Sequence, residues 1–197
     1  MILTKETSVP DAALPVDALK HHLRLGSGFA ASTVQDPVLT SFLRAAMAAI
    51  EARTGKALLQ RDFVLTLERW DDPEAQPLPI APIAHLSQVT ITDRTGTAEY
   101  PDIFRFRTTA DMHAPRLRYQ QRLLPRIPEG GSAEIRFTAG YGETCDDLPA
   151  DLVQAVMLLA AHYYEYRDAT ALGEGCMPFG VTSLVARYRQ MRVGFTS

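Results

Sequence analysis

The stretch Ala139-Gly140-Tyr141-Gly142 leads through Asp146-Asp147-Leu148-Pro149 into the most apolar helical pattern of the chain, Asp151–Arg167. Its first part predicts the end of a strand and a glycine-rich turn. Pro149 then marks a helix start, because the first turn of a helix does not use the N–H that proline lacks. Apolar residues fill most of the circumference of the run, so this helix must be covered on more than one side. We therefore expect residues 149–167 to form a central helix against which the other elements pack.

Two further helices are predicted nearer the N-terminus. Residues 15–25 carry a narrow apolar face, and residues 36–54 show apolar positions at helical spacing that stop before Gly55. The second of these helices carries alanines that leave little side chain, at positions 45, 46, 48 and 49. We expect it to approach the 149–167 helix closely and to form a tight pair with it.

Between these helices the apolar period changes from helical to two, which predicts strands with one buried face. Prolines at positions 73, 77, 79 and 82 argue that the loop Asp71–Pro82 forms no ladder of its own. A one-sided antiparallel sheet over residues 57–139, flanked by a helical bundle, gives the fold class α+β. The expected strands lie near residues 62–68, 88–92, 103–107, 116–119 and 134–139.

The C-terminal part is expected to stand apart from a single α+β domain of residues 1–172. Glycines at positions 173, 175 and 180 loosen the chain there, and a helix is predicted from about residue 182 to 192. That helix has a narrow apolar stripe beside arginines. Two interpretations stay open: residues 173–197 fold back on their own domain, or they form a hinged arm that docks on another subunit.

The composition is that of an ordinary soluble globular protein. The chain has 197 residues, of which 46% are hydrophobic and 22% charged, with a formal net charge of -3. This acidic balance argues against a dedicated nucleic-acid binder. Two cysteines without a metal-binding spacing indicate a reducing compartment. We recognise no signal peptide and no apolar run of membrane-spanning length, so we expect no membrane partner.

No motif of catalysis or cofactor binding stands out. His162 and Glu165 lie one helical turn apart, which is a spacing that di-iron helices use. Those proteins need a second copy of the motif on a partner helix, and this sequence has none. A polar helix edge is therefore favoured over a metal enzyme built on these two residues. We expect no catalytic residue, no cofactor and no metal.

Seven arginines gather around the predicted sheet, at positions 105, 107, 116, 118, 122, 126 and 136. Strand alternation would place several of them on one face, where they could bind phosphate. Acidic residues interrupt this field, so a solvated face or a contact with an acidic neighbour is favoured. The alternative function left open is a small DNA-binding or DNA-packaging accessory protein.

Four motifs follow one another in an order and spacing that resemble a known family. They are Ile50-Glu51-Ala52-Arg53-Thr54-Gly55, Leu78-Pro79-Ile80-Ala81-Pro82-Ile83 with the following Val89-Thr90-Ile91-Thr92-Asp93, Ile135-Arg136-Phe137-Thr138-Ala139-Gly140-Tyr141-Gly142, and His162-Tyr163-Tyr164-Glu165-Tyr166-Arg167. The pattern resembles the head–tail connector (adaptor) proteins of long-tailed bacteriophages and of phage-derived gene transfer agents. The resemblance covers roughly residues 8–192, with Leu124 where the family often has tryptophan.

This resemblance implies a structural role and no enzymatic activity. Such proteins form a ring, usually of twelve copies, beneath the portal at the capsid vertex of a virion or phage-like particle. The ring joins the portal protein to the stopper and tail proteins, and double-stranded DNA passes through its channel without specific binding. A net acidic chain suits such a channel, because bound phosphate would retard the DNA. Assembly in the bacterial cytoplasm is implied as well.

Two sets of candidate interface residues follow from this role. The C-terminal helix is the expected portal-docking arm, through Leu184, Tyr188, Arg189, Met191, Arg192 and Phe195. The alanine-rich helix and the polar stripe of the central helix are candidates for packing between subunits, through Ala45, Ala49, Asp151, Gln154, His162 and Glu165. On this view, Tyr188→Ala leaves the monomer folded and reduces the joining of tails to heads.

Overall fold

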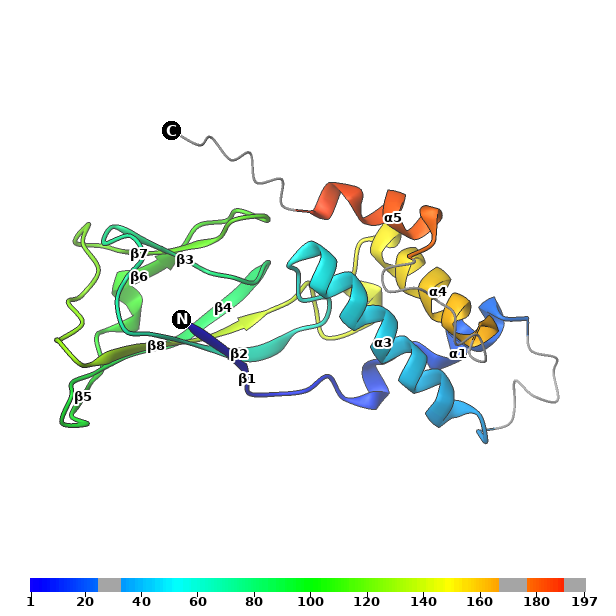
Figure 1. Cartoon of the computed structure of the whole chain (residues 1–197), viewed down its shortest axis with the longest axis horizontal. Helices are drawn as coiled ribbons and strands as arrows, with labels where there is room; N and C mark the ends of the chain where they lie inside the picture. The colour runs from blue at the N-terminus through cyan, green and yellow to red at the C-terminus, as the bar shows by residue number, and fades with distance from the viewer. Residues whose placement is uncertain (25–32, 167–176, 190–197) are drawn as a thin grey trace. The chain divides into compact units, whose positions relative to one another are not determined.

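The computed structural model of the chain describes residues 1–24, 33–166 and 177–189 (Figure 1). These residues form two compact units. The first, which we call the β unit, consists of Met1–Val9 and Gly55–Tyr141, and the second, the helical unit, of the described residues of Pro10–Thr54 and Gly142–Ser197. The sequence predicted one body over residues 1–172. The structure instead separates sheet from helices, because the helical unit collects segments from before and after the sheet.

The larger sheet of the β unit is antiparallel throughout, with the strand order β1-β2-β8-β4-β5. Its central pair is β2 with β8, in a register that places Phe63 opposite Phe137 and Leu65 opposite Ile135. The two phenylalanine rings stack with their centroids 5.7 Å apart. The strands are β1 (Ile2–Lys5), β2 (Arg61–Leu67), β4 (Ile83–Thr92), β5 (Ala98–Glu99) and β8 (Ser132–Ala139).

A second sheet covers the apolar face of the first. It has the order β3-β7-β6, with β3 (Ala75–Pro77), β6 (Phe106–Thr108) and β7 (Arg116–Tyr119) (Figure 1). Leu117 and Phe106 of this sheet join Phe63, Leu65 and Phe137 in one apolar core. Burying a side chain of this size stabilises a fold by about 1.5–3 kcal/mol. The sequence placed helices beside a single sheet, whereas this core forms between two sheets.

The sequence analysis did not predict three strands: β1, β3 and the two-residue β5. Residues 2–5 pair with β2 and form an edge strand of the larger sheet. The proline-rich loop also contains a strand, β3, in which Pro77 is the partner of Arg116. The inference that proline forbids a ladder here was wrong, because β3 is an edge strand, and an edge tolerates a residue without an N–H.

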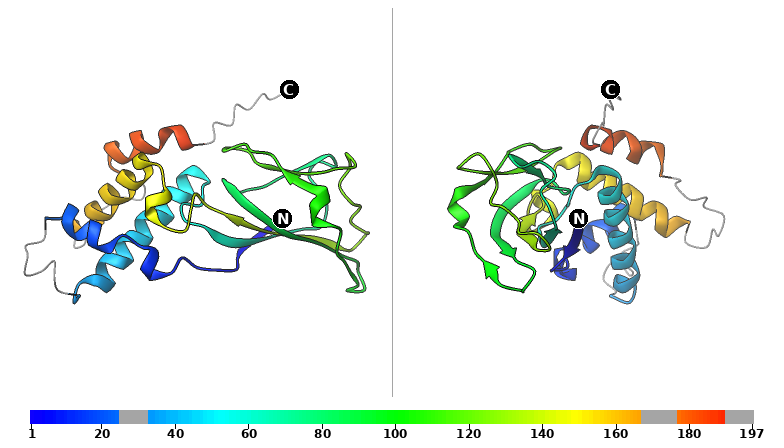
Figure 2. Two further views of the ribbon diagram at one scale, coloured as in Figure 1. Left: turned by 180° about the vertical axis from the view of Figure 1, so that it is seen from behind. Right: turned by 60° about the vertical axis from the view of Figure 1, so that its left-hand side comes forward.

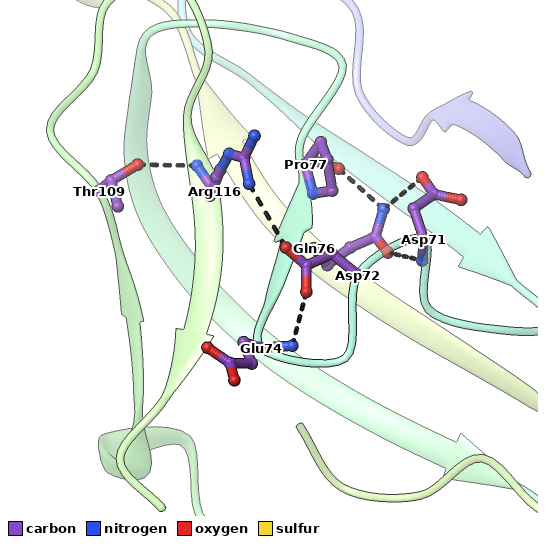
Figure 3. A network of polar contacts seen from close by, with 7 residues as sticks. All are labelled: Asp71, Asp72, Glu74, Gln76, Pro77, Thr109 and Arg116. Atoms are coloured by element: carbon purple, nitrogen blue, oxygen red, sulfur yellow. Dashed lines mark hydrogen bonds and ion pairs between the residues drawn. The ribbon is translucent and has the colours of Figure 1, made fainter. Parts of the chain in front are cut away.

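Gln76 fixes the loop that leads into β3 (Figure 3). Its side chain is fully buried, and its Oε1 accepts a hydrogen bond of 2.8 Å from the backbone N–H of Asp71. Its Nε2 donates to Asp71 Oδ2 and to the Pro77 carbonyl, both at 3.0 Å. Asp72 points instead to Arg116 of β7, 3.5 Å away. Asp71 through Gln76 and Asp72 through Arg116 therefore tie this loop to the smaller sheet.

The helical unit contains α1 (Val16–His22), α3 (Asp36–Thr54), α4 (Ala150–Glu165) and α5 (Phe179–Val185) (Figure 2). The predicted pairing of α3 with α4 is confirmed. Phe42 meets Tyr164 edge to face at 6.2 Å, and the Tyr164 hydroxyl lies 3.3 Å from Gln35 Oε1. Lys20 of α1 is buried and lies 2.6 Å from Asp36, which joins α1 to the start of α3.

The C-terminal helix differs from its predicted bounds. It begins at Phe179, three residues before the predicted start, and ends at Val185, where a 3-10 turn over Ala186–Tyr188 follows. Residues 190–192 of the predicted helix lie outside the described residues. Pro178 precedes it in an extended conformation, which is a common way for a helix to begin. The described helix is too short to form an independent arm, since isolated helices of this length are unstable in water.

Gly140 gives a test of the β unit. Its φ of +138° is unfavourable for other residues, and an added Cβ would lie 2.5 Å from the backbone nitrogen of Gln60. We expect Gly140→Ala to lower the free energy of unfolding by about 3 kcal/mol, measured by urea denaturation. Gly180→Ala is the matched control: its Cβ meets nothing, and alanine favours a helix, so no loss is expected. Equal stability of the two variants would contradict the close approach at Gly140.

Candidate interaction surfaces

A polar cluster holds the C-terminal turn onto α4. The hydroxyl of Tyr188 donates a hydrogen bond of 2.7 Å to Asp151 Oδ1. Arg187 Nη2 lies 2.8 Å from Asp151 Oδ2 and donates to the Tyr188 oxygen at 2.6 Å. The guanidinium of Arg187 also lies over the Tyr188 ring, 4.8 Å from its centroid. We call these three residues the Tyr188 latch.

The latch combines apolar burial with a well-placed charge. Tyr188 is 1% exposed, and Val181 and Val185 of α5 are fully buried with it. Asp151 lies in the first turn of α4, where the helix dipole favours a carboxylate. Burial raises the pKa of Tyr188, so its hydroxyl stays protonated at neutral pH and can donate to Asp151. The described part of the C-terminal segment therefore folds back on its own helical unit.

The predicted portal contacts fall into three groups. Leu184 is half-buried and Arg189 is exposed, so both reach the surface. Tyr188 is buried in the latch, so its ring is not the exposed docking group that the sequence suggested. The reason is tertiary, because the same stripe of a helix serves equally well to pack on α4. Met191, Arg192 and Phe195 lie outside the described residues.

Phe179 is a surface residue that the sequence analysis missed. It opens α5 and is 89% exposed, which makes it one of the most exposed large apolar side chains described. The sequence shows this position as Pro178-Phe179, but the glycines around it predict a hinge. An aromatic side chain that a protein leaves in water marks a candidate contact with a partner.

The candidates for packing between subunits are only partly free. Gln154, Glu165 and Ala45 are exposed, Ala49 is half-buried, and Asp151 is engaged in the latch. His162 is half-buried beside Tyr166, with ring centroids 4.7 Å apart. Its Nε2 is buried without a hydrogen-bond partner among the described residues. A buried nitrogen of this kind gains from a partner, which an approaching subunit could supply.

The described residues contain no group of three or more His, Cys, Asp or Glu that could hold a metal ion. The pairing of His162 with Glu165 thus finds no further ligand there. Burial raises the pKa of Cys145 to about 11, so its thiol stays protonated at neutral pH and is a poor nucleophile. Among the described helices, none is both long and apolar enough to cross a membrane.

The seven arginines do not form one field. Arg107, Arg116 and Arg118 lie on the smaller sheet, with Arg105 in the turn before it. Arg136 lies on β8 of the larger sheet, where it pairs with Glu6 and Glu134. Arg122 pairs with Glu74 at 2.9 Å. The prediction that several arginines share a face is confirmed for the smaller sheet.

Comparison with known proteins gives closely similar solved structures. No protein-family model and no curated protein matches the chain. The chain is 47% identical to a protein in the neck of an empty gene transfer agent particle computed with C6 symmetry, with a TM-score of 0.89. It is 46% identical to one in the virion of a native gene transfer agent particle (TM-score 0.86) and 43% identical to one in the native neck computed with C12 symmetry (0.84). Each match covers 99% of this chain and 98% of the other.

The latch leads to a prediction that replaces the earlier expectation for Tyr188→Ala. We expect this variant to lower the free energy of unfolding by about 3–5 kcal/mol, because it empties a buried aromatic site. Tyr188→Phe keeps the ring and loses only the hydrogen bond to Asp151, so about 1 kcal/mol is expected. Tyr100→Ala, at a tyrosine that is 66% exposed, is the control and should be nearly neutral. Urea denaturation measures all three, and a Tyr188→Ala protein as stable as the wild type would contradict the latch.

Proposed function

Since the chain belongs to the head–tail connector (adaptor) family found in gene transfer agent particles, we propose that it is the adaptor that joins the DNA-filled capsid to the tail. It is a structural protein of a phage-like particle, located at the neck. One observation carries the proposal: the similarity extends over both units and almost the full length of each chain. The assignment of this role therefore rests on similarity over the whole chain and not on one unit that is shared with an otherwise different protein.

The proposed assembly is a ring of twelve copies beneath the portal. The similar neck structures have C6 and C12 symmetry, and a ring of twelve equivalent copies is compatible with both. In this arrangement the portal lies on one side of the ring, and the stopper and tail proteins lie on the other. Double-stranded DNA passes through the channel. The net charge of -3 supports passage without retention.

The C-terminal segment is the proposed portal contact. The latch fixes the chain as far as Arg189 on the helical unit, so the residues that follow start from a defined point. Leu184, Arg189 and the exposed Phe179 supply the apolar and arginine side chains that are enriched in protein interfaces. Met191, Arg192 and Phe195 extend the same proposed contact.

Packing between subunits is proposed for the helical unit. The exposed alanine face of α3 allows a close approach, and Gln154, His162 and Glu165 of α4 offer polar groups. The unpartnered Nε2 of His162 supports this assignment. Asp151 acts within its own chain instead, as the acceptor of the latch. In this role the protein needs no cofactor and no catalytic residue.

The portal contact can be tested without disturbing the latch. A truncation after Gly173 would remove the buried residues of α5, so we expect it to destabilise the helical unit. A chain that ends at Arg189 keeps the latch and lacks only residues 190–197. We expect this chain to remain folded and to lose co-purification with the portal protein of the same particle. Arg189→Ala in the full-length chain should weaken the free energy of binding to the portal protein by about 1 kcal/mol or more, and so reduce co-purification.

One result would contradict the proposed portal contact, and a gene deletion tests the proposed function. Normal portal binding by the chain that ends at Arg189, and by Phe179→Ala and Leu184→Ala variants, would exclude the C-terminal contact. Deletion of the gene tests the function itself, since cells without the adaptor should release DNA-filled heads separate from tails. The control is complementation with the wild-type gene, which should restore joined particles.

A further inference from the structure

The smaller sheet of the β unit carries arginines on the face that points away from its core. Leu117 of β7 and Phe106 of β6 are buried, so the neighbouring residues of each strand point outward. Four arginines in or next to these strands, at positions 105, 107, 116 and 118, are exposed. We call this surface the basic face, made of Arg105, Arg107, Arg116 and Arg118.

Two of these arginines oppose each other. Arg107 is the cross-strand partner of Arg118 in the β6–β7 register. Ion pairs tie Arg105 to Asp102 (3.9 Å) and Arg116 to Asp72 (3.5 Å), but no carboxylate of the described residues pairs with Arg107 or Arg118. Like charges directly opposite each other destabilise a sheet. The monomer therefore keeps a repulsive pair that an acidic partner would neutralise.

The β unit also has a surface of the opposite sign. A hollow of about 930 Å³ lies at one end of the larger sheet, near the end of β2 and the start of β8. Hydrogen bonds from Thr95 and Thr97 lower the pKa of Asp93, which keeps it ionised at neutral pH. Glu68 and Glu129 are exposed and have no partner among the described residues. We call this surface the acidic hollow, lined by Glu68, Asp71, Asp93 and Glu129 with one arginine, Arg69.

We infer that the basic face of one copy binds the acidic hollow of the next copy around the ring. The inference rests on the proposed ring and names the surfaces that close it. Neighbours in a ring meet head to tail, so each chain must carry both halves of the contact. The β unit meets this requirement, because the basic face is on the smaller sheet and the acidic hollow is at the end of the larger one.

A second copy of the chain fits the basic face better than DNA does. Arginine next to aromatic residues is the composition of protein interface centres. Phe104 directly precedes Arg105 and is 91% exposed, and Tyr100 is 66% exposed. Asp102 and Asp72 already neutralise half of the arginines, and the chain has a net charge of -3. Both facts oppose the binding of phosphate.

Charge exchange provides the test. The first variant carries Arg107→Glu and Arg118→Glu, the second carries Glu68→Arg and Glu129→Arg, and the third carries all four changes. Asp71 and Asp93 stay unchanged, because their carboxylates bind Gln76 and the turn at Thr95. Lys5→Glu with Arg53→Glu is the control, since both residues are exposed and the change in net charge equals that of the first variant.

Each variant replaces the wild-type gene in a particle-producing cell, and electron microscopy counts heads joined to tails. We expect the first and second variants to reduce joined particles at least about tenfold, and the four-change variant to restore them. The control should resemble the wild type. Urea denaturation of each purified chain checks folding. If the first variant is unstable, it is replaced by a variant that carries Arg107→Gln and Arg118→Gln.

Two outcomes would overturn the inference. Wild-type joining by both two-change variants would show that neither surface is needed. Loss of joining in the first and four-change variants alike, together with loss of salt-dependent DNA retention, would assign the arginines to DNA instead. A failure of the proposed function is distinct from both, because cells that lack the gene altogether would then still join heads to tails.

Discussion

The β unit depends on the close pairing of β8 with strands on both of its sides. Strand β8 pairs with β2 on one side and with β4 on the other, and it contributes Ile135 and Phe137 to the core. Its end at Gly140 packs against the backbone of residues 59 and 60 with no room for a side chain. A strand held on both sides is the most constrained position in a sheet. Displacement of β8 would therefore break the hydrogen bonds to both neighbouring strands and disrupt the packing of the core.

In the proposed adaptor role, the two units differ in the chemistry that they offer to partners. The helical unit is apolar inside, and its latch sets the point from which the C-terminal residues continue. The β unit is also apolar inside, but charge of both signs is sorted onto different parts of its surface. Apolar contact and hydrogen bonding suit the stable contact that we propose with the portal. Complementary charge suits recognition between identical chains, because it sets orientation as well as affinity.

Charge also bears on the proposed passage of DNA through the ring. A net acidic chain repels phosphate on average, so its arginines must be balanced locally if DNA is to pass freely. Three of the arginines around the smaller sheet are paired within their own chain, Arg105, Arg116 and Arg122. Arg107 and Arg118, which oppose each other across β6 and β7, have no such partner among the described residues.

The amino-acid sequence by itself determined the helices, most strands and the family. The spans of α3 and α4 follow from apolar periodicity and from Gly55 and Pro149, which act within one or two turns of the chain. The family follows from the order of short motifs, which needs no knowledge of contacts. Tertiary structure alone decided that Pro77 lies on an edge strand, that a second sheet covers the core, and that Tyr188 faces inward. It also placed Arg107 opposite Arg118. These features depend on which distant segments meet and in what register. Local patterns indicated the pairing of α3 with α4 but not these contacts.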